Sequence, residues 1–156
     1  DQVLIQAKEK GLKVAFNPAP MTESVKQLPS DCIDLLIVNE VEAEEISGRQ
    51  NLDQMEAYFR QDWPHAEVLI TLGKAGVRML KKDRTIDVPS FTVEAVDTTA
   101  AGDTFIGFFL SAYSSHSDAD TALRRACAAS ALAVMQVGAA QSIPNEEQVN
   151  RFLAKQ

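Results

Sequence analysis

The stretch that organises the sequence is Asp97-Thr98-Thr99-Ala100-Ala101-Gly102-Asp103-Thr104-Phe105. It separates two regions with different patterns. Before it, apolar runs of strand type alternate with stretches of helical periodicity, and from Ala100 onward only helical patterns follow. Strands that alternate with helices and then give way to a helical tail are typical of an α/β domain with a mostly parallel sheet.

The apolar runs predict the individual strands and helices. A continuous apolar run such as 34–38 indicates a strand that is covered on both faces. The predicted strands are 12–16, 34–38, 67–72, a hairpin partner at 77–80, and one or two short edge strands within 86–93 that Pro89 interrupts. The predicted helices are an opening one that ends at Gly11, then 40–46, 52–60, one that starts at 100, one through the alanine-rich stretch 122–133, and 146–153. No linker or repeat divides the sequence, so residues 1–156 are interpreted as a single domain.

Composition narrows the classes of partner. The 156 residues are 46% apolar and 24% charged, which is typical of a globular protein. The formal net charge is −7 and no Lys/Arg cluster interrupts it, so a nucleic acid and an anionic membrane are both disfavoured. Cys32 and Cys127 lie far apart and form neither a disulfide framework nor a CxxC pair, which favours the reducing cytoplasm.

The stretch 97–105 also predicts an anion site, because free N–H groups and the positive dipole end meet at the start of a helix. Ala100, Ala101 and Gly102 remove side-chain bulk there, and a glycine in a helix costs up to about 1 kcal/mol against alanine. Asp103 could take the proton of an acceptor hydroxyl in phosphoryl transfer. The alternative is ordinary capping by Thr99, with Asp103 favouring the dipole. A capping box fits poorly, because Ala100 carries no oxygen.

These nine residues resemble the C-terminal signature of the ribokinase-like (pfkB) carbohydrate kinases, approximately D-T-x-[AG]-[AG]-G-D-x-F. Further segments agree with that family in the same order, namely Asn17–Pro20, Asn39–Glu44, Thr71–Gly76 and Gly138–Pro144. The resemblance covers nearly the whole chain. It implies the family's three-layer α/β fold, represented here by its nucleotide-binding C-terminal portion, without the N-terminal half and the lid.

The resemblance implies roles for the helix start and for one further motif. Asp103 would be the catalytic base toward the primary hydroxyl of a sugar, and Ala100, Ala101 and Gly102 would form the anion hole over the transferred phosphoryl group. Asn39 and Glu42 match the family's N-x-x-E motif, which helps to organise Mg²⁺ and the phosphates of ATP. The same spacing is also that of a capping box, with Asn39 as N-cap and Glu42 at the third helical position.

Other positions match the nucleotide and cation sites of the family. Thr71, Gly73 and Gly76 resemble the loop on the phosphate and ribose side of ATP, although a plain hairpin turn explains them equally well. Cys127 falls near the adenine ring in the family, and its alternative is a small buried residue in an alanine-rich helix. The remaining positions correspond to a monovalent cation site, usually occupied by K⁺: Asp97, Thr99, Ala133, Gln136, Gly138 and Ser142.

The sequence says least about the sugar that would accept the phosphoryl group. Family members carry most of their sugar contacts in the absent half, and lid strands that often form a homodimer interface, so this chain alone is expected to be inactive. The resemblance favours D-ribose, with fructose, 2-keto-3-deoxygluconate and nucleosides left open. A non-catalytic nucleotide-binding fragment is the alternative from another functional class. Neither GxxxxGK[ST] nor GxGxxG occurs, which disfavours P-loop and dinucleotide-binding proteins.

Overall fold

The computed structural model describes residues 2–115 and 118–156, apart from the side chain of Lys26. The described chain forms two compact units. The first comprises Asp1–Leu72 and Arg78–Asp87, and the second comprises Gly73–Val77 and Val88–Gln156. The single domain expected from the sequence stays a prediction.

A five-stranded sheet has the order β1-β2-β3-β4-β5. Its first three strands are parallel, with Leu35 of β2 opposite Ala15 on one side and Glu67 on the other. The connections that flank β4 are far shorter than the dozen or so residues that a parallel crossover requires, so β4 runs against its neighbours. The strands are β1 Ala15–Phe16, β2 Leu35–Asn39, β3 Glu67–Thr71, β4 Val77–Leu80 and β5 Thr85–Val88. The predicted α/β class with a mostly parallel sheet is confirmed.

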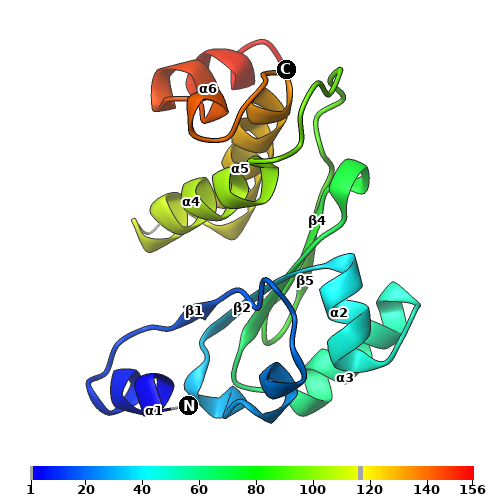
Figure 1. Cartoon of the computed structure of the whole chain (residues 1–156), viewed down its shortest axis with the longest axis vertical. Coiled ribbons are helices and arrows are strands. Elements are labelled where there is room, and N and C mark those ends of the chain that lie inside the picture. The colour runs from blue at the N-terminus through cyan, green and yellow to red at the C-terminus, as the bar shows by residue number, and fades with distance from the viewer. Residues whose placement is uncertain (1, 116–117) are drawn as a thin grey trace. The chain divides into compact units, whose positions relative to one another are not determined.

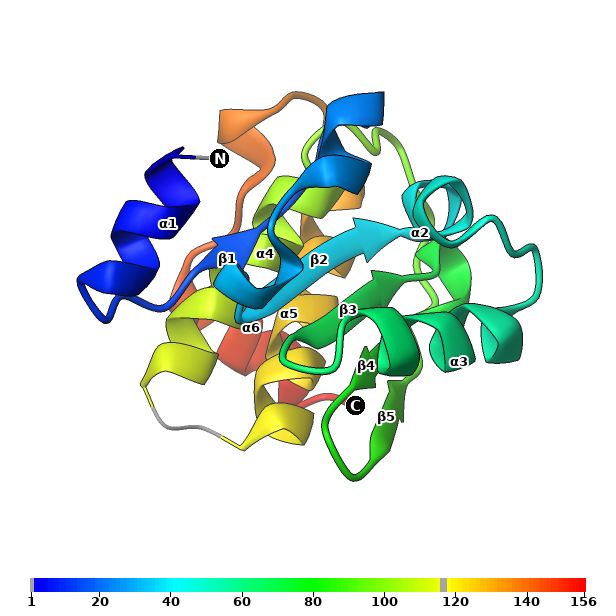
Figure 2. The same cartoon turned by 90° about the horizontal axis from the view of Figure 1, so that it is seen from below.

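The first unit has three helices, and the second and third of them pack on the central strands, which are apolar on both faces. The helices are α1 Gln2–Glu9, α2 Glu40–Ser47 and α3 Leu52–Asp62. Met55 and Phe59 of α3 enter the same core as Leu36 and Val68 of the sheet. Gly48 ends α2 with φ 66°, a left-handed conformation that favours glycine. Figure 2 shows β1, β2 and β3 side by side and α2 next to α3.

The second unit is built on three helices, α4 Ala101–Ser114, α5 Ala119–Val134 and α6 Glu146–Leu153 (Figure 1). The alanines of α5 are almost fully buried, and their small side chains let α4 lie close against it. The ring of Phe109 on α4 is completely buried and stacks on Phe105 and Tyr113 of the same helix. Short 3₁₀ turns complete the chain at Glu23–Gln27, Ser30–Cys32, Gly73–Ala75 and Ala140–Ser142.

Two predicted strands are shorter in the structure. The first keeps only Ala15–Phe16 of the expected 12–16. The edge strand expected within 86–93 is Thr85–Val88 and ends just before Pro89, which has no N–H to donate to a ladder. Within the part of the chain that the structure describes, no helix combines the length and the apolar character needed to cross a membrane.

An ion-pair network joins α3 to β4 and β5. Arg78 on β4 donates two bonds to the Asp87 carboxylate, at 2.7 and 2.8 Å, and reaches Asp53 and Glu56 at 3.3 Å. Only 17% of the Arg78 side chain is exposed, so water screens these bonds less than those of an open surface pair. The guanidinium in turn holds the pKa of Asp87 below its ordinary value.

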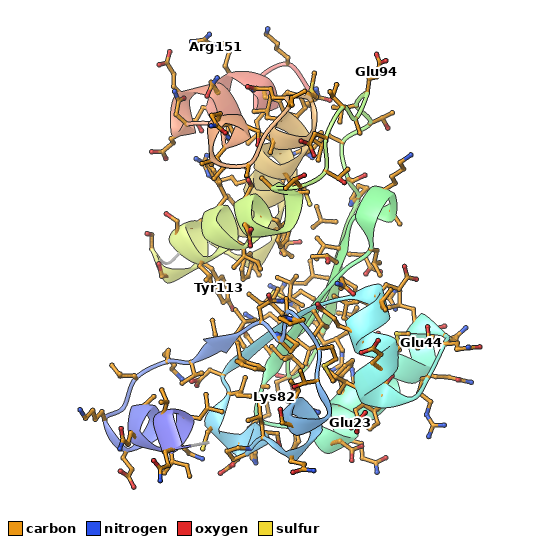
Figure 3. The ribbon with its side chains drawn as sticks, viewed as in Figure 1. Glu23, Glu44, Lys82, Glu94, Tyr113 and Arg151 are labelled. Carbon is orange, nitrogen blue, oxygen red and sulfur yellow. The ribbon has the colours of Figure 1, made fainter. Side chains whose placement is uncertain are left out.

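Replacing Arg78 by Met should lower the free energy of unfolding by about 1–2 kcal/mol, because it removes a largely buried, bidentate partner from a group of carboxylates. Urea unfolding measures the loss. The matched control is Arg151→Met on α6, where the side chain extends outward (Figure 3) and pairs with an exposed Glu147. That change should stay within about 0.5 kcal/mol. Equal losses in the two variants would contradict the network's role.

Candidate functional site

The carboxyl ends of the parallel strands bring three polar residues of the first unit to one edge of the sheet. Asn39, the last residue of β2, lies directly opposite Thr71, the last residue of β3. Asn17 follows β1, and its side-chain amide donates to the Ile37 carbonyl oxygen at 2.8 Å. In open α/β sheets this edge is where ligands bind. Two residues predicted to contact the nucleotide, Asn39 and Thr71, are therefore neighbours in the structure.

The structure shows that Asn39 and Glu42 form a capping box. The Asn39 side chain accepts the backbone N–H of Glu42 at 2.9 Å, and Oε2 of Glu42 accepts the backbone N–H of Asn39 at 2.9 Å. The structural alternative is thereby confirmed. It does not use up the polar groups, since Glu42 keeps its other carboxylate oxygen and Asn39 keeps its side-chain NH₂ group. The Mg²⁺ and phosphate role of the pair stays a prediction.

The start of α4 lacks a side-chain cap among the described residues. Ala100 is the N-cap residue, and no side chain accepts from the first turn. The first N–H groups of a helix have no acceptor within the helix. In this turn the Ala101 N–H donates to the Thr98 carbonyl oxygen at 3.2 Å, and the N–H groups of Gly102 and Asp103, which have no acceptor among the described residues, remain available to a ligand. Gly102 and Asp103 are both exposed, and a Cβ added at Gly102 would meet nothing within 4 Å. The capping alternative with Thr99 as N-cap is wrong.

Thr99 instead binds Asp97. Oδ1 of Asp97 accepts the Thr99 hydroxyl at 2.5 Å and the Thr99 backbone N–H at 2.9 Å, while Oδ2 accepts the Gly138 N–H at 3.0 Å. The Thr99 hydroxyl and then the Gly138 N–H lower the pKa of Asp97 to about 2. Three residues predicted for the cation site are thus brought together by hydrogen bonds, and a carboxylate held in its charged form suits a cation.

The other predicted cation ligands lie at the end of α5 and on the segment that follows it. The Ala133 carbonyl oxygen accepts the Gln136 N–H at 3.1 Å, and the Ser142 hydroxyl is 1% exposed and donates to the Ala139 carbonyl oxygen at 2.7 Å. Gly138 adopts a φ of 105°. All of these oxygens are hard ligands of the kind that K⁺ prefers. Among the described residues, no group of three or more His, Cys, Asp or Glu side chains could hold a metal ion.

Both glycines of the loop have a structural explanation. Gly76 has a φ of 111°, and a Cβ there would lie 2.1 Å from the Val88 carbonyl oxygen. Gly73 has open space around it, but its φ of 55° is left-handed and favours glycine. The Ser90 hydroxyl donates to the Lys74 carbonyl oxygen and ties this loop to the segment after β5. Gly76 is therefore required for the close approach of two backbone segments, whether or not a nucleotide binds.

Cys127 is buried within α5, and burial raises the pKa of its thiol to about 11. A thiol with so high a pKa is not a nucleophile at neutral pH, which agrees with the structural alternative. Its proposed place near the adenine ring stays a prediction.

Sequence reasoning missed two hydroxyls behind the start of α4. Ser130 of α5 donates to the Ala101 carbonyl oxygen at 3.1 Å. Thr104 is 2% exposed, and its hydroxyl has no partner among the described residues. The sequence offered one indication of Ser130, since it is a polar residue within the alanine-rich run of α5.

The bonds to Asp97 should make the stability of the chain depend on pH in a defined window. Since the pKa of Asp97 in the folded state, about 2, lies below its ordinary 3.8, the stabilisation is present above the ordinary value and is lost as pH falls through about 2. Urea unfolding should show Asp97→Asn to be less stable than the unsubstituted chain near neutral pH. The difference should shrink below about pH 4, where the carboxyl group of Asp97 begins to be protonated in the unfolded chain, and should be lost near pH 2, where it is protonated in the folded chain as well. Ser111→Ala, at an exposed position of α4, changes no titratable group; it is the control and should show no such trend. A difference that does not change with pH would contradict this role.

Comparisons with known proteins agree on one family. The model of the pfkB family carbohydrate kinases matches residues 1–146. The chain is 39% identical to a ribokinase of Haemophilus influenzae over 151 residues, which cover 94% of this chain and 49% of that protein. It is 40% identical to a ribokinase of Staphylococcus aureus over 155 residues, covering 93% and 49%. The chain thus spans about half the length of these curated relatives.

Solved structures give the same result for the fold. A ribokinase of Thermotoga maritima superposes with a TM-score of 0.86 at 34% identity, covering 97% of this chain and 52% of that one. A ribokinase of Arabidopsis thaliana, solved with ribose and ATP, gives 0.83 at 28% identity, covering 97% and 51%. With its nine-residue signature at the start of α4 and a matching family model over most of its length, the chain belongs to the pfkB family of carbohydrate kinases.

Proposed function

We propose that this chain is the nucleotide-binding portion of an ATP-dependent sugar kinase, and that it supplies the catalytic base, Asp103. The observation that carries the proposal is the start of α4, where an uncapped first turn, an exposed Gly102 with open space around it and an exposed Asp103 carboxylate follow one another. Transfer of a phosphoryl group needs both an anion site and a proton acceptor, and these residues offer both.

The roles follow from the chemistry of the groups. The N–H groups of the first turn, at Ala101, Gly102 and Asp103, together with the positive end of the helix dipole, would stabilise the charge of the transferred phosphoryl group. Ala100, the N-cap residue, leaves the approach free of a long side chain. The Asp103 carboxylate would accept the proton of the sugar's primary hydroxyl as its oxygen attacks the γ-phosphorus of ATP.

ATP would bring Mg²⁺, which neutralises charge on the β- and γ-phosphates. The free carboxylate oxygen of Glu42 and the side chains of Asn39 and Thr71 are the groups in the first unit that would help to organise it. In the second unit, Gly73 would line the phosphate side of the nucleotide. The Asp97 site would hold K⁺, which would order the backbone around the start of α4.

D-ribose is the proposed acceptor. Relatives named ribokinase reach 39–40% identity, against 32% for one named deoxyribokinase in Salmonella typhi. The Arabidopsis ribokinase was solved with ribose and ATP together. Because the chain spans half the length of such proteins, the sugar pocket would be completed by residues outside it, and a dimer through lid strands would belong to the longer protein.

A second candidate is a nucleotide-binding fragment without catalysis. Such a fragment would bind the phosphates of ATP at the same uncapped first turn of α4 without transferring a phosphoryl group. The two functions share ATP binding and differ in phosphoryl transfer, so they require separate experiments.

Nucleotide binding is tested by adding one methyl group at Gly102. Because nothing lies within 4 Å of that position, Gly102→Ala should fold normally, with a melting temperature equal to or above that of the unsubstituted chain. The methyl group would occupy the approach to the anion site, so affinity for Mg²⁺·ATP by calorimetry should fall about tenfold or more, the equivalent of 1.4 kcal/mol. Gly107→Ala is the matched control, since Gly107 is exposed on the same helix with equally open surroundings. Equal affinities for the two variants would refute the anion site.

Catalysis is tested with Asp103→Asn in the longest gene product that contains this sequence. The amide cannot accept the hydroxyl proton, so kcat for D-ribose phosphorylation should fall by about two to four orders of magnitude. The affinity for ATP should stay within about threefold, because the backbone N–H groups remain. Unchanged kcat would remove Asp103 as the base. ATP binding without activity in the unsubstituted protein, toward D-ribose or any other sugar, would favour the second candidate.

A further inference from the structure

The Thr104 hydroxyl is the anomalous polar group of the second unit. It is 2% exposed and has no hydrogen-bond partner within residues 2–115 and 118–156. A buried hydroxyl without a partner destabilises a protein, and Val would fill the same volume without that penalty. In a helix, a Thr hydroxyl ordinarily donates to the carbonyl oxygen four residues before it. For Thr104 that oxygen belongs to Ala100.

The Ala100 carbonyl oxygen lies within the turn that starts α4. It accepts the Thr104 backbone N–H at 3.0 Å, which leaves one lone pair unused. Helical side chains lean toward the helix N-terminus, so the Thr104 side chain leans toward this turn. The Ala100 carbonyl and the Ala101 N–H belong to the same peptide group. A hydrogen bond to the first therefore polarises the second and makes it a better donor.

The neighbouring peptide group already has this arrangement. Ser130 donates to the Ala101 carbonyl oxygen at 3.1 Å, and the N–H of that peptide group is the one of Gly102. By its bond to the Ala101 carbonyl oxygen, Ser130 thus orients and polarises the Gly102 N–H, which is one donor of the first turn. Thr104 lies one turn beyond Ala101 on the same face of α4, in position to support the preceding donor. The hydroxyls of Thr104 and Ser130 therefore lie on the carbonyl side of two consecutive peptide groups, Ala100–Ala101 and Ala101–Gly102.

The Ala101 N–H is weakly engaged in the unliganded chain. It donates to the Thr98 carbonyl oxygen at 3.2 Å, which closes a turn. Ala100 has φ −98° and ψ 6°, values typical of the third residue of a type I turn rather than of the extended backbone usual at an N-cap. A small rotation of the Ala100–Ala101 peptide group would release the N–H from Thr98 toward an incoming anion.

We infer that Thr104 is a positioning residue for the proposed anion site. When phosphate binds at the start of α4, the Ala101 N–H turns from the Thr98 carbonyl oxygen to the ligand. The Thr104 hydroxyl then donates to the Ala100 carbonyl oxygen and fixes the peptide group in its binding orientation. Thr occupies two χ1 rotamers in helices, so the change needs one side-chain rotation. The inference rests on the proposed function, because it describes how that site is completed.

The test is Thr104→Val in the 156-residue chain, with Mg²⁺·ATP as the probe. Val keeps the shape and removes the hydroxyl, so the melting temperature without ligand should be unchanged or higher. ATP affinity by calorimetry should fall about three- to tenfold, the range of one neutral hydrogen bond. Thr104→Ser keeps the hydroxyl and should bind ATP within about twofold of the unsubstituted chain. Ser111→Ala, which removes a hydroxyl farther along α4, is the control and should change neither quantity.

A second measurement needs no variant. Three-bond couplings to the Thr104 methyl carbon report χ1, and they should change from one rotamer to another when ATP is added to the unsubstituted chain. Unchanged χ1, or full ATP affinity in Thr104→Val, would overturn the inference and leave the anion site standing. If the unsubstituted chain fails to bind ATP, the proposed function of this chain falls and the inference with it.

Discussion

The start of α4 is held by the carboxylate of Asp97, which lies outside the helix. That side chain binds Thr99 on one oxygen and Gly138 on the other. The backbone N–H groups of Val96 and Asp97 both donate to the Val134 carbonyl oxygen, at the last residue of α5. The segment before α4 is therefore anchored to the end of α5 by backbone and side chain together. The other features of the second unit depend on this anchor, because it orients the helix without using the N–H groups of its first turn.

An ordinary helix is fixed at its start by an N-cap side chain that occupies those same N–H groups. The first unit shows this arrangement at α2, where Asn39 and Glu42 satisfy each other's backbone N–H groups. In α4 the two tasks are separated. Asp97 and the end of α5 fix the direction of the helix, and no side chain caps its first turn. A helix start that is positioned from outside and left uncapped is what an anion site requires.

The sequence predicted the elements well wherever a single local rule determined them. Continuous apolar runs located β2 and β3, and the Asn-x-x-Glu spacing located the start of α2, because strand burial and capping are decided by neighbouring residues. Prediction was weaker where a distant segment decides. Capping of α4 by Thr99 was left open as an alternative, but the Thr99 hydroxyl donates to Asp97, whose other carboxylate oxygen is held by Gly138 from the distant segment after α5. The contact between Ser130 and Ala101, and the isolation of the Thr104 hydroxyl, arise from the packing of α4 on α5, which no spacing within either helix reveals.

Two glycines of the second unit, Gly76 and Gly102, would be kept in evolution for different reasons. At Gly76 the chain has no room for a methyl group, since the Val88 carbonyl oxygen already occupies that space. At Gly102 the space is vacant. Purifying selection at the first would act through the folded state itself, and would persist in a descendant that had lost every ligand. At Gly102, selection would cease once the ligand was no longer bound. Related proteins that keep Gly76 but have another residue at the position of Gly102 would therefore be those in which the anion site no longer binds its ligand.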